Sequence, residues 1–199
     1  MRDLIINKIV NKLKEYKKYS NIEIIKIRYG LEGFIRFLEK IVIILIIGIF
    51  LNLLKEMLIF MFFYMIIKLN SGGAHAKNSF WCLIFSLIIF IGIPYLGKAT
   101  IINTAFKLIV LFISVFIFYK YSPASTHKKP IIYNKNKLKR NSILILIIYC
   151  ISSLFLKNYI GNILILSVIT QAFFIMPISY KIFNVPYIKW KERLYVIYI

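Results

Sequence analysis

Long uncharged apolar runs, separated by short polar segments, dominate the pattern of the chain. Such runs are typical of helices that cross a bilayer. The first two are short against the ~20 residues that a crossing helix needs, so a single kinked span or an incomplete hairpin is an alternative there. The pattern predicts an all-α, polytopic integral membrane protein with six transmembrane helices, at 34–54, 56–69, 80–96, 100–119, 142–156 and 160–180.

The boundaries between these spans follow from residues that interrupt helices. Gly92, Pro94 and Gly97 close the third span. Residues 120–141 are polar and basic and contain two prolines, which predicts a loop. We therefore expect one membrane domain, 1–199, with amphipathic cytoplasmic-face helices over 1–33, six spans over 34–180 and a cytoplasmic tail over 181–199.

The N-terminal segment has a different pattern. Over residues 2–19, Ile5, Ile9 and Leu13 recur at helical spacing among several lysines, which predicts an amphipathic helix. A basic helix with an apolar stripe suits a membrane surface, and an ordinary helix packed on the rest of the protein is the alternative. Ser20 and Glu23 then form a capping-box pattern, which predicts that a second helix starts there.

The distribution of charge orients the spans. The formal net charge is +20, with 27 Lys and Arg against seven Asp and Glu. With the N-terminus in the cytoplasm, the cytoplasmic segments hold 23 of the 27 and the outer turns hold Lys55, Lys98 and Lys157, as the positive-inside rule expects. We expect anionic lipid as a partner and no nucleic acid, because the basic residues lie between apolar spans.

Lys107 is the remaining cation and falls inside the fourth predicted span. A lysine at that depth is costly and can mark a functional position. Alternatively, its long side chain reaches outward to the membrane surface, which we favour.

Few residue types are available for chemistry within the spans. Residues 57–191 contain no Asp or Glu, and the chain has two histidines and two cysteines, His75, His127, Cys82 and Cys150. Only His75 and Cys82 are close in sequence. A thiolate with a neighbouring imidazole can act as nucleophile and base.

The spacing of His75 and Cys82 restricts how they can meet. Seven residues along a straight helix place the two side chains ~10.5 Å apart along the axis, whereas a dyad needs about 3 Å. Residues 70–78 should therefore not form one helix, and Gly72 and Gly73 can supply the turn. Without a nearby carboxylate, Asn78, Ser71 or a backbone carbonyl would orient the imidazole.

Other interpretations of these residues stay open on spacing alone. A cysteine in a span is most often a small packing residue, and a histidine at a helix end is often an interface residue. A metal site would need His75, His127, Cys82 and Cys150 from three distant segments. We predict no metal and no cofactor.

Two motifs nevertheless resemble one known family. Ser-Gly-Gly-Ala-His-Ala at 71–76, with Cys82 seven residues after the histidine, resembles the accessory gene regulator B (AgrB) family of membrane cysteine endopeptidases. The segment 121–131, Tyr-Ser-Pro-Ala-Ser-Thr-His-Lys-Lys-Pro-Ile, is similar to the family's Tyr-Ala-Pro-x-Asp-Thr-x-x-Lys-Pro-Ile loop. The motifs stand in the family's order and at about its spacing.

The chain departs from the family pattern at three positions. Ser125 stands where the family often has Asp, and Ser122 replaces the usual Ala. Lys68 stands where an Arg is expected, which keeps the charge but loses the bidentate fork. His75 and Cys82 match without change.

The resemblance implies a specific activity. An AgrB-like enzyme cleaves the acidic C-terminal tail from an AgrD-like pheromone precursor through an acyl-enzyme thioester and promotes cyclisation to a thiolactone or lactone. It implies His75 as general base and Cys82 as nucleophile. Supporting roles fall on Ser71, Gly72 and Gly73 for the loop and an oxyanion, and on Lys68, Lys128 and Lys129 for the precursor tail.

The resemblance also implies a homodimer in the bacterial cell membrane, multi-pass, with both termini and the catalytic site on the cytoplasmic side. Cys150 is expected to be structural. The alternative from another class is a non-enzymatic membrane protein, such as a small transporter or a peptide-export component.

Overall fold

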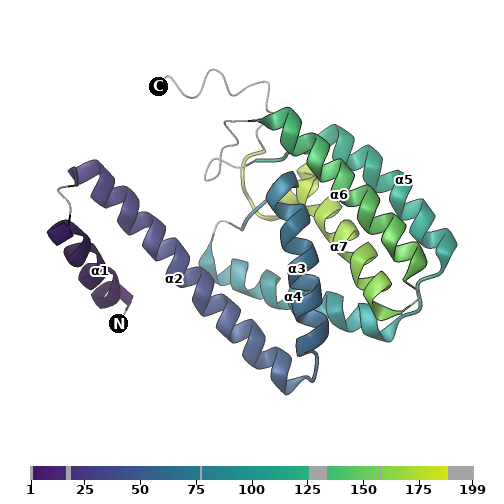
Figure 1. The fold of residues 1–199 in the computed structure, drawn as a ribbon, viewed down its shortest axis with the longest axis horizontal. Helices are drawn as coiled ribbons and strands as arrows, with labels where there is room; N and C mark the ends of the chain where they lie inside the picture. The colour runs from purple at the N-terminus through teal and green to yellow at the C-terminus, as the bar shows by residue number, and fades with distance from the viewer. Residues whose placement is uncertain (1, 17–18, 77, 126–133, 157, 188–199) are drawn as a thin grey trace. The chain divides into compact units, whose positions relative to one another are not determined.

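The computed structural model describes residues 2–16, 19–76, 78–125, 134–156 and 158–187. Regular structure in these ranges is helical, apart from one isolated bridge between Gly72 and Ala124, which confirms the all-α class (Figure 1). The described residues form eight helices: α1 Arg2–Tyr16, α2 Asn21–Phe50, α3 Leu54–Ser71, α4 Ser79–Ala99, α5 Thr104–Tyr121, α6 Lys135–Phe155, α7 Tyr159–Ile175 and α8 Pro177–Ile182.

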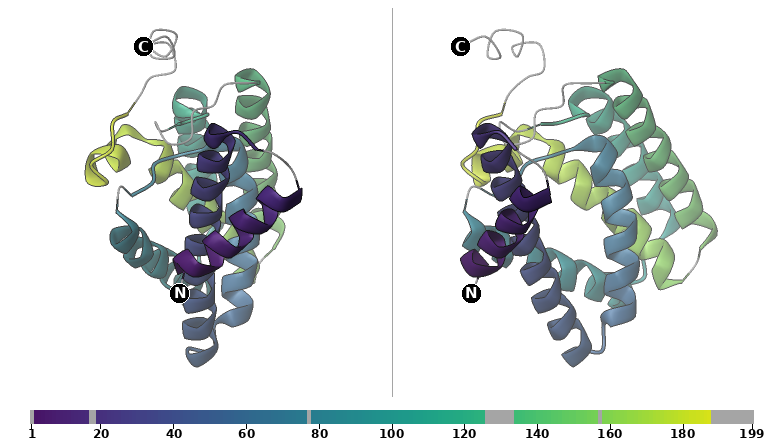
Figure 2. Two further views of the ribbon diagram at one scale, coloured as in Figure 1. Left: turned by 90° about the vertical axis from the view of Figure 1, so that its left-hand side faces the viewer. Right: turned by 60° about the vertical axis from the view of Figure 1, so that its left-hand side comes forward.

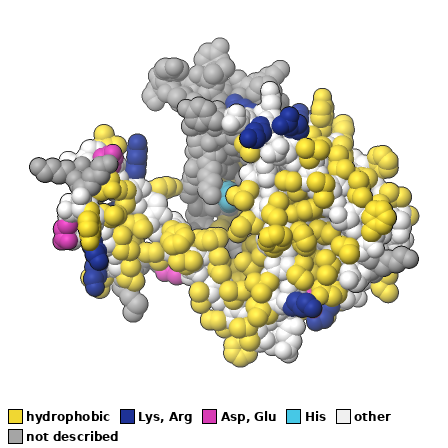
Figure 3. All heavy atoms as spheres, viewed as in Figure 1, with side chains coloured by type: hydrophobic (Ala, Val, Ile, Leu, Met, Phe, Trp, Pro, Cys, Tyr) yellow, Lys and Arg dark blue, Asp and Glu magenta, His cyan; other side chains and the backbone are white. Residues whose placement is uncertain are grey.

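Three of the described helices are long and apolar enough to cross a membrane: Phe80–Ala99, Thr104–Tyr121 and Lys135–Phe155. Helix α7 is a shorter apolar helix. In the face shown in Figure 3, hydrophobic side chains cover much of the C-terminal helices, with Lys and Arg side chains toward both ends. These features identify a membrane protein, while six complete crossings stay a prediction.

Residues 1–50 form one compact unit, built from α1 and α2. The predicted capping box is confirmed: the Ser20 backbone N–H donates to Glu23 Oε2 at 2.8 Å, and the Glu23 N–H donates to Ser20 Oγ at 3.3 Å. Helix α1 packs on α2 and buries Ile6 and Val10. Leu4, Ile5 and Ile9 of α1 are exposed. Helix α1 therefore has an apolar surface in addition to the one that packs on α2.

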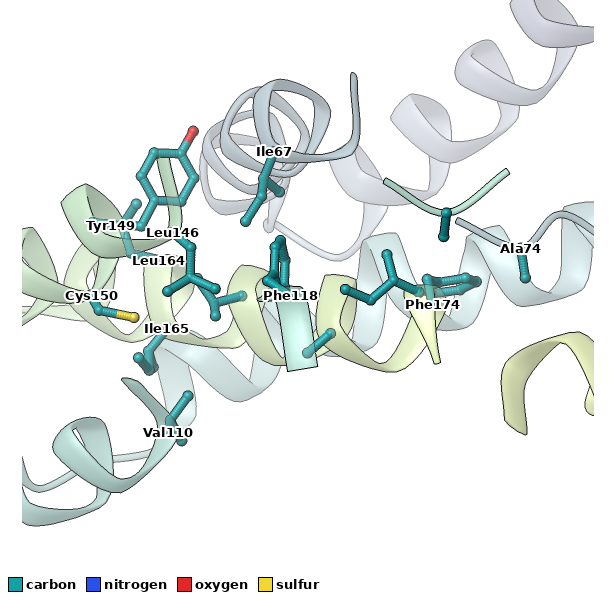
Figure 4. Close-up of a cluster of buried hydrophobic side chains, with 14 of the residues drawn as sticks. Ile67, Ala74, Val110, Phe118, Leu146, Tyr149, Cys150, Leu164, Ile165 and Phe174 are labelled. Atoms are coloured by element: carbon teal, nitrogen blue, oxygen red, sulfur yellow. The ribbon is translucent and has the colours of Figure 1, made fainter. Parts of the chain in front are cut away.

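Residues 51–199 form the second unit, and α7 is its centre. Twelve of the 17 residues of α7 are buried, because the helix packs against α3, α4, α5 and α6 (Figures 1 and 2). Buried side chains around α7 form a large apolar cluster (Figure 4), and a smaller cluster contains Phe60, Tyr64 and Ile163. A helix buried on nearly all sides is apolar nearly all round, as the sequence of α7 is.

Several helix boundaries differ from those expected. Helix α4 continues to Ala99, three residues beyond the expected end at Leu96. The expected loop 120–141 is helical from Lys135, because lysine, arginine and leucine are good helix formers. The expected sixth span is divided at Met176, since Pro177 restricts the preceding residue to an extended backbone and starts α8.

Lys107 does not reach outward to the surface. Its side chain is only 5% exposed, and its Nζ donates to the Ser153 carbonyl oxygen at 2.6 Å. That carbonyl belongs to the last turn of α6 and lacks a partner within the helix. The ammonium therefore caps the C-terminus of α6, where the helix dipole favours a cation.

Glu56 and Lys98 join the first turn of α3 to the last turn of α4. Glu56 is the sole carboxylate of the sequence between residues 40 and 191, is only 7% exposed, and lies 2.9 Å from Lys98 Nζ.

Lys98→Ala is expected to lower the free energy of unfolding by about 1 kcal/mol, because it leaves a buried carboxylate unpaired while Lys98 itself is half exposed. Thermal unfolding in detergent measures the effect.

Lys55→Ala is the matched control for this ion pair. Lys55 is exposed, and its removal leaves the contact between Glu56 and Lys98 intact. We expect its unfolding temperature to stay near that of the wild type. Equal losses in the two variants would show that the ion pair does not stabilise the junction of α3 and α4.

Candidate functional site

The first motif forms a non-helical connection between α3 and α4. Helix α3 ends at Ser71, and α4 begins at Ser79, so the expectation that residues 70–78 do not form one helix is confirmed. Gly72 and Gly73 have φ angles of 70° and 126°, a backbone that residues with a side chain rarely adopt. The glycine pair therefore supplies the turn.

This connection pairs with the second motif through backbone hydrogen bonds. The Gly73 N–H donates to the Ala124 carbonyl at 3.0 Å, and the Ala124 N–H donates to the Ser71 carbonyl at 2.8 Å. Gly72 and Ala124 form a short parallel bridge, so close that a Cβ on Gly72 would overlap the Ala124 carbonyl oxygen. Two segments about fifty residues apart in sequence thus form one structure.

The C-terminal end of α7 holds the other side of the connection. The Ala74 N–H donates to the Phe174 carbonyl at 2.9 Å, and Figure 4 shows these two residues side by side at one edge of the core. From the preceding turn of α7, Gln171 Nε2 donates to Ser71 Oγ and to the Gly72 carbonyl. The backbone leading to His75 is therefore fixed on two sides.

These contacts change the role expected for the glycines. The Gly72 N–H donates to the Lys68 carbonyl at 2.9 Å and the Gly73 N–H donates to Ala124, so neither is available to an oxyanion in this structure. The glycines instead shape the loop and allow its close contact with the second motif. Ser71 contributes to the loop through its buried hydroxyl, which donates to the Ile67 carbonyl at 2.8 Å.

The second motif is anchored by α6 and α8. The Ser122 and Ser142 hydroxyls lie 2.7 Å apart, and Ser142 Oγ already donates to a carbonyl of α6, so Ser122 is the donor between them. Tyr180 Oη donates to the Ser125 carbonyl at 3.2 Å. The Ser125 hydroxyl is buried without a hydrogen-bond partner among the described residues.

His75 and Cys82 lie at the two ends of the segment that enters α4. His75 is half-buried and directly follows the buried Ala74. Cys82 is half-buried in the first turn of α4, where its N–H donates to the Asn78 carbonyl at 3.0 Å. The candidate base therefore sits on a fixed loop and the candidate nucleophile on a helix terminus.

A cavity of about 400 Å³ lies between the start of α4 and the end of α8. Trp81 and Phe85 of α4 form one wall, and the end of α8 with the residues after it forms another. None of the described residues that line it is charged, although the chain as a whole is strongly basic. They are Ala76, Asn78, Trp81, Phe85, Ile182, Phe183 and Asn184.

Lys68 lies at the same end of the helices, in the last turn of α3. Its ammonium donates to Tyr64 Oη at 2.9 Å and lies 4.7 Å from the centroid of the Phe174 ring. A cation over an aromatic face is favourable, so this charge is held near the loop. Lys128, Lys129 and His127 lie outside the described residues.

Cys150 occupies a different environment. It is 1% exposed in α6 and packs in the apolar core, as Figure 4 shows for its sulfur among aliphatic side chains. The part of the chain that the structure describes contains no group of three or more His, Cys, Asp or Glu side chains that could hold a metal ion.

Comparison with known proteins identifies relatives along most of the chain. The sequence model of the family "Accessory gene regulator B" matches residues 6–175. Accessory gene regulator protein B of Staphylococcus aureus strain MW2 is 33% identical over 177 residues, which cover 88% of this chain and 95% of that protein. A putative AgrB-like protein of Clostridium acetobutylicum is 28% identical over 184 residues, covering 91% and 88%. No solved structure matches.

The fold and its paired motifs define a helical membrane protein whose candidate site is a loop clamped between helices. The family match and the relatives cover most of its length. The chain belongs to the accessory gene regulator B family, which confirms the resemblance drawn from its two motifs. Membership indicates a role in peptide processing within the accessory gene regulator system of quorum sensing.

Three residues that hold the loop were not found from the sequence. Gln171, Phe174 and Tyr180 come from the C-terminal helices, far from both motifs along the chain. Gln171 carried a signal, because a glutamine within an apolar run needs a polar partner when buried. Phe174 holds the loop through its backbone carbonyl, and a pattern of side chains along the sequence cannot predict a backbone contact.

Proposed function

We propose that this protein is a membrane-embedded cysteine endopeptidase that cleaves an AgrD-like precursor peptide, with Cys82 as nucleophile and His75 as general base. The observation that carries the proposal is the clamp between the two family motifs. It fixes the backbone just before His75 and leads directly into the helix that bears Cys82. Covalent catalysis requires a base held within reach of its nucleophile, and a fixed loop at His75 supports that arrangement.

The proposed chemistry conserves atoms and charge at each step. His75 takes the proton from the Cys82 thiol, and the sulfur attacks the precursor carbonyl. The peptide C–N bond breaks, the leaving amine takes the proton from His75, and the C-terminal tail departs. The remaining precursor is a thioester on Cys82.

The thioester then allows ring closure without ATP. A cysteine of the precursor displaces Cys82 by thiol–thioester exchange, which forms a thiolactone and conserves the bond type. A serine in the same position would form a lactone. In both cases the proton lost by the attacking group passes to the Cys82 sulfur and restores the thiol.

The substrate side of the proposal rests on charge. An acidic precursor tail would meet the basic face that carries Lys68, together with Lys128 and Lys129 of the second motif. The charge asymmetry supports a cytoplasmic location for this face and both termini in the bacterial cell membrane. We also propose that the protein is a homodimer and that anionic lipids surround it.

Intact mass of the purified protein mixed with its precursor peptide tests this function. We expect an adduct with the mass of the precursor minus its tail. The adduct should be absent in Cys82→Ala, which lacks the nucleophile, and in His75→Ala, which lacks the base.

Two results would contradict the proposal. A folded protein that binds the precursor yet gives neither adduct nor free tail would favour a non-enzymatic transporter or export component. An adduct that persists in Cys82→Ala would place the nucleophile at another residue, with Cys150 tested first.

A further inference from the structure

Gln171 is a buried polar side chain of α7 that contacts the first motif directly. It is 0% exposed, and its Nε2 lies 2.7 Å from Ser71 Oγ and 2.6 Å from the Gly72 carbonyl oxygen. These two residues precede His75 by four and three positions. One amide group therefore reaches, from a distant helix, the segment that carries the candidate base.

The neighbours of the amide fix its orientation. The Gly72 carbonyl can only accept a hydrogen bond, so the Gln171 atom facing it is the nitrogen. The Ser71 hydroxyl donates to the Ile67 carbonyl, so it also accepts from Gln171. The NH₂ group satisfies two acceptors at once, which no apolar side chain of the same size can do.

The carbonyl oxygen of the same amide is unfavourably placed. Gln171 Oε1 is buried without a hydrogen-bond partner among the described residues, and an unpaired buried acceptor destabilises a fold. The compensating gain visible in the structure is the hold on Ser71 and Gly72. That hold acts at Gly72, the first of two consecutive glycines with positive φ, and glycine is otherwise free to adopt many other backbone angles.

We propose that Gln171 is a positioning residue for the peptidase: its amide holds Ser71 and Gly72 so that His75 stays within reach of Cys82. The inference rests on the proposed function. Gln171 acts through the loop and does not touch the reacting atoms. Its loss should therefore slow the chemical step and leave precursor binding unchanged.

Gln171→Met in the full-length protein tests this role, because methionine keeps the length of the side chain and removes its N–H groups. We expect kcat for tail release to fall about tenfold or more with KM unchanged. The rate at which iodoacetamide alkylates Cys82 should fall in parallel. A purely structural role would lower the unfolding temperature without changing these rates for folded protein.

Thr170→Val is the matched control. Thr170 is the neighbouring buried polar residue, and its hydroxyl donates within α7 to the Leu166 carbonyl. We expect its kcat and its alkylation rate to stay near wild type. Wild-type rates in folded Gln171→Met, or a change confined to KM, would overturn the inference.

Ser71→Ala provides a second measurement if Gln171→Met does not fold. It removes one of the two acceptors and keeps every backbone hydrogen bond of the loop, so kcat should fall by a smaller factor with KM unchanged. An unchanged kcat would overturn the inference. A wild-type protein that forms no acyl adduct would instead defeat the proposed function, whereas equal adduct rates in wild type and Gln171→Met defeat this inference alone.

Discussion

Gly73→Ala is expected to lower precursor cleavage on the order of 100-fold while the helices still form. Gly73 has a φ of 126°, which alanine rarely adopts, and a Cβ there would stand 3.1 Å from the Phe174 carbonyl oxygen. That oxygen accepts the hydrogen bond from Ala74, directly before His75. The loop must move to relieve the contact, and His75 moves with it. Tail release, measured beside circular dichroism, gives the result.

Gly92→Ala is the matched control for this loss. Gly92 lies within α4, and a Cβ there would have no heavy atom within 4 Å. Alanine is also the better helix former by about 1 kcal/mol. We expect unchanged cleavage and equal or higher stability. Cleavage at wild-type rate in Gly73→Ala would mean that the observed loop geometry is not needed for activity.

Features that depend on neighbouring residues were predicted well from the sequence. Gly72 and Gly73 were expected to break the helix, and the structure gives both positive φ angles. The capping box at Ser20 and Glu23 also forms. Each depends on residues within a few positions of one another, so side-chain type alone carries the information.

The parts that depend on distant segments were not predicted. The pairing of Gly73 with Ala124 uses only backbone groups, which every sequence possesses and no pattern of side chains reveals. The Gly73 N–H was expected to be open to an oxyanion, and its acceptor, the Ala124 carbonyl, lies 51 residues away in sequence. Lys107 was misassigned for the same reason, since its acceptor is the carbonyl of Ser153, 46 residues away.

The helix boundaries show a related limit. The third span was expected to end at Leu96, yet α4 continues through Gly97 to Ala99. The last turn of α4 is held by α7, where Asn162 Nδ2 donates to the carbonyls of Gly97 and Thr100. A partner from another helix therefore compensates for local residues that disfavour the helix, as packing commonly does.

Cys82→Ala is expected to abolish tail release, whereas Cys150→Ala retains it. The reaction needs a sulfur that the precursor can approach. Cys82 is half-buried in the first turn of α4, next in sequence to Trp81, which lines a cavity of about 400 Å³, while Cys150 is 1% exposed in the apolar core. Loss of an obligatory nucleophile removes the covalent pathway entirely, whereas truncation of Cys150 costs only packing. Release of the tail from the precursor, followed by mass spectrometry, measures both variants.

Alkylation of the wild type and of His75→Ala tests access to the two cysteines separately from catalysis. Iodoacetamide should modify Cys82 faster than Cys150 in the folded wild type, and His75→Ala should slow that modification because the base that removes the thiol proton is gone. Equal and slow modification of both cysteines would argue against an activated Cys82. Tail release that survives in both Cys82→Ala and Cys150→Ala would show that neither cysteine is an obligatory nucleophile. That result would contradict the proposed role of Cys82, and it would also contradict a non-enzymatic function because the precursor is cleaved.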